Sequence, residues 1–187
     1  MLVDREHIWV VGMKGAGRYD REKGDWILFT RENGKMPSVK SQNLHRSPHG
    51  RLYVGMQDGL GRWNGEEERF ERILPALIDE TVGQVTSWHK DTLIVVSSTR
   101  CYFFHENSDS LTFITSYGPE DGVDLIEFNE NGAMIDGNDR LYLSGPESIH
   151  RFDLTRLRSV APPAPSISVK SVGAERLPFT GKTVDYL

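Results

Sequence analysis

The chain has 187 residues, of which 37% are apolar, and a formal net charge of −5 with an isoelectric point near 5.7. This length suffices to bury the core of one domain or of two small ones. The chain has no basic tract and no run of about 18 apolar residues, so we expect no nucleic-acid partner, no anionic membrane surface and no membrane span in this segment.

Four short apolar segments recur along the chain, at 8–12, 52–55, 93–97 and 141–145. If Trp9, Tyr53, Ile94 and Tyr142 are equivalent, successive segments are 44, 41 and 48 residues apart. A period of roughly 40 to 50 residues is typical of propeller blades, each a four-stranded sheet, and also of some helical repeats. These short apolar runs, rich in Val, Ile, Trp and Tyr, are too short for helices and indicate strands. Residues 8–11 and 93–96 are apolar throughout, which predicts strands covered on both faces.

A second, aromatic strand follows each segment after a turn that is mostly rich in glycine, at 17–20, 61–64, 100–104 and 149–153, which predicts four hairpins. A third strand is expected at 26–30, 69–73 and 111–115, and an inner strand at 39–44, 82–88 and 125–128. The residues that define the repeat are Trp9, Gly12, Gly17, Tyr53, Gly55, Gly59, Trp63, Ile94, Tyr142 and Gly145. The third unit has Ser97–Arg100 in place of a glycine turn, so its hairpin is expected to be irregular.

Composition also predicts a domain boundary near residue 161. Ala161–Pro165 is a proline-rich hinge that cannot continue the interior of a sheet, and the alternating residues 166–172 predict a new strand. We therefore expect a first domain over 1–160 and the start of a second over 161–187. The first unit has only residues 1–7 before its repeat strand, so we expect either a fragment of a longer protein or closure by a strand from elsewhere.

Several of these motifs, in this order, resemble a known family. Asn33–Ser38, Gly50–Gly55, Asp58–Leu60 and Arg62–Trp63 together resemble the two-component regulator propeller repeat. Glu127–Asn129, Leu141–Gly145 and Arg151–Leu154 are similar to the last blade of that family, and the hinge at Pro162–Pro163 is similar to the start of its immunoglobulin-like triple-tyrosine domain. Each motif alone is short, so the specificity of the resemblance comes from the order in which the motifs occur.

The resemblance implies an all-β fold: a partial β-propeller of about four four-stranded blades, then the first strands of an immunoglobulin-like sandwich domain. It implies a non-catalytic, ligand-sensing segment of a membrane-bound receptor such as a hybrid histidine kinase or diguanylate cyclase. The segment would face the periplasm or the exterior and bind a carbohydrate or another small molecule, without a cofactor and without touching the membrane itself. The family usually has seven or more units, and this chain contains no kinase, cyclase or other output domain and no apolar signal segment at Met1–Glu6.

Two other classes of function stay open. A propeller enzyme such as a polysaccharide lyase or glycosidase would need converging acids or a metal. A structural or protein-interaction propeller would instead use an exposed apolar or sheet-edge surface. An incomplete ring exposes such edges, which predicts self-association or continuation into further blades.

Two loop motifs that resemble ligand-binding loops are better interpreted as turns. Gly12–Gly17 could cradle a phosphate, but an aromatic strand follows it and not a helix, which favours a hairpin turn. Asp136–Glu147 resembles a calcium loop, but Arg140 and Leu141 stand at positions where such a loop needs a ligand and a glycine, which favours a turn.

The histidines, the cysteine, the acidic clusters and the tryptophans are likewise given structural interpretations. His45 and His49 could pair on a helix, which Pro48 forbids, so locally bonded or solvated histidines are expected, as for His7, His89, His105 and His150. Cys101 is expected to be a buried thiol that is not a nucleophile. The acids at 66–68, 79–80 and 120–121 are expected on a solvated rim, and Trp9, Trp26, Trp63 and Trp88 in the core between blades and not stacked on sugars.

Overall fold

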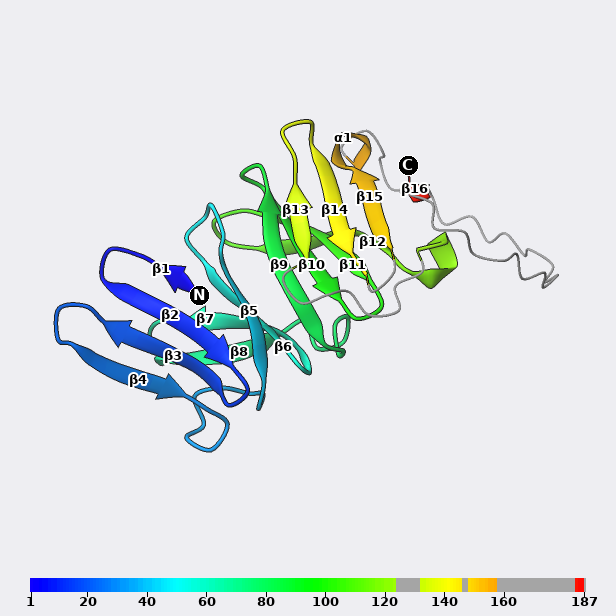
Figure 1. Cartoon of the computed structure of the whole chain (residues 1–187). Helices are drawn as coiled ribbons and strands as arrows, with labels where there is room; N and C mark the ends of the chain where they lie inside the picture. Colours follow the sequence, from blue (N-terminus) through cyan, green and yellow to red (C-terminus); the bar gives the residue numbers. More distant parts are fainter. Residues whose placement is uncertain (124–131, 146–147, 158–183, 187) are drawn as a thin grey trace.

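The computed structural model describes residues 1–123, 132–145, 148–157 and 184–186. These residues form four sheets of four strands each, which follow one another in chain order as a row (Figure 1). Only a short helix α1 (Leu154–Leu157) and a 3-10 turn η1 (Pro119–Asp121) interrupt the strands in this part of the chain. The predicted all-β class and the four four-stranded blades are confirmed.

In each blade, strands adjacent in sequence are neighbours in the sheet. Blade 1 contains β1 (Leu2–Val3), β2 (His7–Gly12), β3 (Gly15–Asp20) and β4 (Asp25–Phe29). Blade 2 contains β5 (Ser41–Arg46), β6 (Leu52–Met56), β7 (Gly59–Asn64) and β8 (Arg69–Ile73). Blade 3 contains β9 (Val82–Trp88), β10 (Thr92–Ser97), β11 (Cys101–Glu106) and β12 (Leu111–Tyr117). Blade 4 contains β13 (Ala133–Ile135), β14 (Arg140–Ser144), β15 (Ile149–Asp153) and β16 (Val184–Tyr186).

Blade 4 differs from the sequence-based prediction in two ways. Residues 125–128, predicted as its inner strand, lie outside the described residues, and β13 pairs with β14 instead. The fourth strand, β16, comes from residues 184–186 and runs parallel to β15, whereas every other pair of neighbouring strands is antiparallel. The proline hinge and residues 166–172 also lie outside the described residues, so the division into domains over 1–160 and 161–187 stays a prediction.

The hydrophobic core consists of three clusters, each between two successive blades. Trp9 and Phe29 pack against β6 and β8, Tyr53 and Leu60 pack against β10 and β11, and Ile94 and Phe103 pack against β14 and β15. Every residue of β10 is buried, as predicted for a strand covered on both faces. The same prediction is wrong for 8–11, where only Trp9 is buried, because no described blade covers the other face of blade 1.

The strand register shows that the four repeat residues occupy the same position in their blades. Trp9 pairs with Arg18, Tyr53 with Arg62, Ile94 with Phe103 and Tyr142 with Arg151 across the central hairpin of each blade. The strand pairing also shows which glycines of blades 1 and 2 are equivalent, and this differs from an alignment of the motifs by their order. Gly12 pairs with Gly15 and Met56 pairs with Gly59, so Gly15 corresponds to Gly59 and Gly17 to Gly61. Gly55 lies within β6, and Gly145 follows β14 directly.

In blade 3 a carboxylate stabilises the turn that lacks glycine. One oxygen of Glu80 accepts a hydrogen bond from Ser97 at 2.6 Å and one from Tyr102 at 3.3 Å. The other oxygen accepts from Ser98 at 2.8 Å and from Thr99 at 2.7 Å. Burial alone would raise the pKa of Glu80, but these hydrogen bonds outweigh it and lower the pKa. The pairing of β10 with β11 is therefore regular, and the predicted irregularity lies instead between β9 and β10.

We expect Glu80→Gln to cost about 1–2 kcal/mol of unfolding free energy at pH 7, a modest loss because Glu80 is only half-buried and water screens it. The folded-state pKa is lowered, so the carboxylate's stabilisation is full above its ordinary pKa of 4.5 and is lost as the pH falls through the folded-state value. Urea titrations at pH 7 and pH 3 should show a difference between the two proteins that shrinks in acid. Glu66→Gln, on an exposed turn, is the control, and an unchanged difference at pH 3 would refute the assignment.

Candidate functional site

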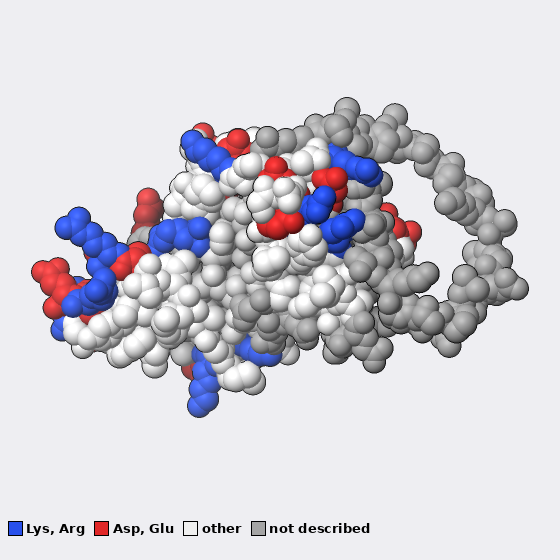
Figure 2. Space-filling view, turned by 45° about the horizontal axis from the view of Figure 1, so that its top comes forward, with Lys and Arg blue, Asp and Glu red and all other residues white. Residues whose placement is uncertain are grey.

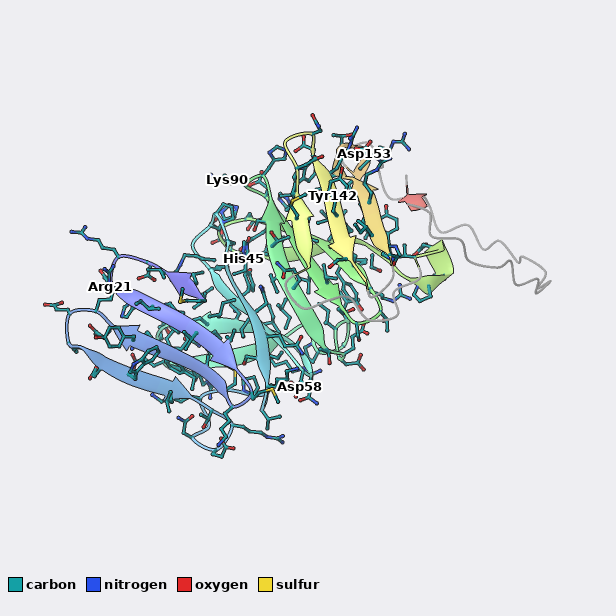
Figure 3. All side chains as sticks on the ribbon, in the orientation of Figure 1. Arg21, His45, Asp58, Lys90, Tyr142 and Asp153 are labelled. Carbon is teal, nitrogen blue, oxygen red and sulfur yellow. The ribbon has the colours of Figure 1, made fainter. Side chains whose placement is uncertain are left out.

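Alternate turns of all four blades lie on one rim, which we call the first rim and define by residues 4–6, 21–24, 47–51, 65–68, 89–91, 107–110 and 136–139. In Figure 3, Arg21, His45, Lys90 and Asp153 mark this edge, and Asp58 lies at the opposite edge. Between blades 1 and 2 the first rim is hollowed by about 460 Å³. The lining residues are Asp4, Arg5, Glu6, His7, Trp9, Arg18, Arg46, Leu52 and Trp63.

Two tryptophans and an arginine form the inner wall of this hollow. The rings of Trp9 and Trp63 meet edge to face, with centroids 5.1 Å apart. The Arg18 guanidinium carbon lies 5.6 Å from each of these ring centroids, a cation–π distance. Trp9 is only 3% exposed, and neither its Nε1 nor Nε of Arg18 has a hydrogen-bond partner among the described residues. The wall therefore combines aromatic surface with fixed positive charge.

An ion pair crosses the hollow from one blade to the other. Arg46, at the end of β5, donates to Oδ2 of Asp4 at 2.8 Å. Oδ1 of Asp4 accepts from the backbone N–H groups of Glu6 at 3.0 Å and His7 at 2.7 Å. Burial alone would raise the pKa of Asp4, but these N–H groups and the charge of Arg46 lower it. Asp4 thus stays ionised and holds the β1–β2 turn against blade 2.

A second hollow of about 770 Å³ lies beside the first and shares Arg5, Glu6 and His7 with it. Its remaining lining residues are Asp20, Arg21, Glu22 and Lys23, all charged. Figure 2 shows acidic and basic side chains side by side on this face, without a broad patch of one sign. The first hollow is thus the better candidate for a small ligand, because partly exposed aromatic surface of Trp63 and charged donors converge in it.

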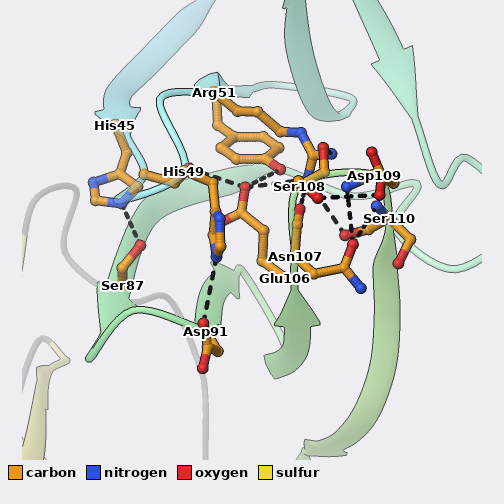
Figure 4. Close-up of polar contacts among 12 residues, drawn as sticks. His45, His49, Arg51, Ser87, Asp91, Glu106, Asn107, Ser108, Asp109 and Ser110 are labelled. Atoms are coloured by element: carbon orange, nitrogen blue, oxygen red, sulfur yellow. Dashed lines mark hydrogen bonds and ion pairs between the residues drawn. The ribbon is translucent and has the colours of Figure 1, made fainter.

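Farther along the first rim, a buried carboxylate joins blades 2 and 3 (Figure 4). Glu106, at the end of β11, is 1% exposed. Its Oε1 accepts hydrogen bonds from Ser47 and Tyr53, each at 2.9 Å, and lies 3.4 Å from Nη1 of Arg51. Arg51 also donates to the carbonyl of Asn107 at 2.7 Å and to that of Ser108. We call this set of contacts the Glu106 latch, because it fixes the β11–β12 turn to blade 2.

The histidines face nearby polar groups or are exposed, as predicted for locally bonded or solvated histidines. Nε2 of His45 lies 2.7 Å from Oγ of Ser87, and burial lowers the pKa of His45. His49 faces Asp91 at 3.4 Å, His89 faces Asp139 at 3.1 Å, and His150 faces Ser148 at 2.9 Å. His7 lies 3.7 Å from Asp4, while His105 is exposed on β11. No group of three or more His, Cys, Asp or Glu side chains suited to a metal occurs in the described part of the chain.

The turn interpretations of the two loop motifs are confirmed. Gly12 and Gly15 flank the tight β2–β3 hairpin turn, which precedes a strand. Asp136 begins the β13–β14 turn, and its Oδ1 accepts from the backbone N–H groups of Asn138 and Arg140, both at 2.9 Å. The backbone N–H of Asp136 donates to the carbonyl of Arg140, as that of Ser47 does to the carbonyl of Arg51, so the two turns match in register as predicted.

Cys101 is fully buried as predicted, and burial raises the pKa of its thiol. Trp9 and Trp88 lie in the core, and Trp63 packs against it. The core prediction is wrong for Trp26, which is 52% exposed on the outer strand of blade 1 and contacts the Tyr19 ring at a tilt, with centroids 5.2 Å apart. Most acids of 66–68, 79–80 and 120–121 are exposed, but Glu80 is half-buried and bonded to four hydroxyls.

The fold is similar to that of solved extracellular domains. One belongs to a protein from B. thetaiotaomicron described as a hybrid two-component system, with a TM-score of 0.67 at 10% identity over 83% of this chain and 23% of that chain. A second such domain from the same organism gives a TM-score of 0.59 at 15% identity, over 81% of this chain and 19% of that chain. The β-propeller domain of Cps50 (Swd1) from Myceliophteria thermophila gives a TM-score of 0.56 at 11% identity, over 80% of this chain and 52% of that chain.

At these identities the similarity establishes the propeller fold. The chain spans less than a quarter of the length of the two B. thetaiotaomicron domains. No protein-family model matches the chain, and no curated protein matches it. No helix in the described ranges is long and apolar enough to cross a membrane.

Proposed function

We propose that this chain is a ligand-sensing propeller segment of a signal-transduction receptor, of the two-component or cyclic-dinucleotide kind, and that it has no catalytic activity of its own. The proposal places the segment outside the cytoplasm. It is supported by the propeller fold, which the chain shares with extracellular domains of proteins described as hybrid two-component systems.

The hollow between blades 1 and 2 is the observation that carries the proposal. Its volume lies within the range of small-molecule sites, and its wall offers the half-buried ring of Trp63 as aromatic surface together with arginine donors for hydroxyl or carboxylate groups. Its two walls come from different blades, so an occupant would contact both at once. Such an occupant would stabilise their contact, which is how binding could bias a sensor.

Isothermal titration calorimetry with short neutral and uronate-containing oligosaccharides tests the proposal. We expect at least one class to bind, and we expect Arg46→Ala to weaken that binding about tenfold or more by removing a charged donor of the hollow. Arg69→Ala is the matched control, because Arg69 is also a half-exposed arginine paired with acids, Glu67 and Glu71, but lies outside the hollow.

Equal loss of affinity in both variants would place the ligand elsewhere. Release of reducing sugar ends by the purified chain would contradict the non-catalytic proposal.

A further inference from the structure

The face of blade 1 that points away from blade 2 is a continuous apolar surface. Val3, Ile8, Tyr19 and Trp26 are opposite one another in register and form one row across the four strands. Leu28 lies in the next row, opposite Gly17. Val3, Trp26 and Leu28 are each more than half exposed. The central part of this face carries no charged side chain.

The corresponding face is buried in the other blades. In blade 2 the equivalent residues Leu52, Trp63 and Phe70 pack against Trp9 and Phe29 of blade 1. In blade 3 Leu93 and Phe104 pack against blade 2, and in blade 4 Leu141 and Phe152 pack against blade 3. Three of the four blades therefore cover this apolar face with the preceding blade, whereas in blade 1 no described residue outside the blade covers it and Val3, Trp26 and Leu28 stay exposed.

The outer face of blade 4 has the pattern that blade 1 uses to cover blade 2. In blade 1 the covering row is Leu2, Trp9 and Arg18, opposite one another in register. In blade 4 the equivalent row is Met134, Tyr142 and Arg151. Met134 is 60% exposed, and Ile149 in the adjacent row is 57% exposed. The two ends of the row of blades thus carry matching halves of an inter-blade contact.

We propose that a second copy of this chain covers the outer face of blade 1 with the outer face of its own blade 4, so that copies associate head to tail. Tyr142 and Arg151 would then lie on Tyr19 and Trp26 as Trp9 and Arg18 lie on Trp63 and Phe70, where the Arg18 guanidinium carbon is 5.6 Å from the Trp63 centroid. This arrangement continues the packing that the chain already uses between its own blades. A contact between two blade 1 faces would instead leave Met134 and Ile149 on the outer face of blade 4 exposed.

Two copies supply eight blades, which is within the range of closed propellers. A head-to-tail contact gives a ring if the rotation between copies closes it and a filament if it does not. Either form covers both outer faces, and the molar mass distinguishes them.

Size-exclusion chromatography with multi-angle light scattering tests the proposal on the whole chain. The wild-type protein should show a mass above the 21.2 kDa of one copy, rising with concentration. Leu28→Glu on blade 1 and Met134→Glu on blade 4 should each weaken association by about 30-fold or more, because each places a charge in the apolar contact. Ile114→Glu is the control, because Ile114 is also exposed on a strand but belongs to neither outer face. Far-ultraviolet circular dichroism should show that all variants stay folded.

Mixing Leu28→Glu with Met134→Glu is the decisive experiment. Each variant retains one intact face, so the mixture should form a heterodimer with a single interface although neither variant associates alone. A wild-type monomer at every concentration would overturn the proposal. So would association that Leu28→Glu abolishes and Met134→Glu leaves unchanged, which would indicate pairing of two blade 1 faces, or loss of association in Ile114→Glu.

Discussion

Replacing Gly15 by alanine should destabilise the protein by about 3 kcal/mol or more, the largest effect that we expect from any single methyl group. Gly15 has a φ angle of +116°, which side chains rarely adopt, and a Cβ built there would lie 2.2 Å from the carbonyl oxygen of Phe29. The clash is with the backbone of β4, so no side-chain rotation can relieve it. Gly59, the equivalent residue of blade 2, has φ +125° and would place its Cβ 2.9 Å from the carbonyl oxygen of Ile78.

Urea denaturation of Gly12→Ala provides the matched control. Gly12 pairs with Gly15 in the same hairpin, but nothing lies within 4 Å of a Cβ built at Gly12. We expect Gly12→Ala to change the unfolding free energy by less than about 1 kcal/mol. Similar losses in the two variants would show that glycine is needed there for chain flexibility and not for this backbone geometry.

Breaking the Glu106 latch should have an effect of similar size. Glu106→Ala removes a buried carboxylate and leaves Arg51, Ser47 and Tyr53 without their shared acceptor, so we expect a loss of about 3–5 kcal/mol. Glu106→Gln keeps an acceptor oxygen but not the charge opposite Arg51, and we expect a smaller loss. Urea titration at neutral pH measures both.

Glu67→Ala is the control for the latch. Glu67 lies on the same rim in an exposed ion pair with Arg69, and such pairs contribute about 0–1 kcal/mol. Hydrogen exchange should also show faster exchange of the amides of Asn107 to Ser110 in Glu106→Ala, because Arg51 no longer holds that turn in place. Unchanged exchange in this turn would mean that the latch contributes stability without positioning the loop.

Much of the fold could be predicted because it repeats. Four apolar segments at one period predicted the central strands, and β8, β9 and β15 occupy the predicted residues. The inner strand of blade 4 was harder to place, because β13 is only three residues long and has little alternation. Residues 8–11 were wrongly predicted to be covered on both faces, because the sequence of an all-apolar strand does not show which of its two faces has a neighbour.

The candidate site depends on contacts between distant segments, and this limited its prediction. Trp9 and Trp63 were identified as repeat aromatics, but the hollow between them exists only because blade 1 packs on blade 2, and Arg18 meets Glu68 across 50 residues of sequence. Glu106 resembles any acidic residue at a strand end, since its partners Ser47, Arg51 and Tyr53 lie more than fifty residues earlier. Arg51, just before the repeat strand, and Tyr53, within it, were the available signal that a buried acid would face them.

Nuclear magnetic resonance of the four tryptophan indole N–H groups tests the proposed sensing site most directly. Trp9 and Trp63 line the hollow, Trp88 lies in the core between blades 3 and 4, and Trp26 lies on the outer face of blade 1. When the oligosaccharide that binds in calorimetry is added, the account predicts shifts of the Trp9 and Trp63 signals, with those of Trp88 and Trp26 unchanged. Shifts confined to Trp26 or Trp88 would contradict it.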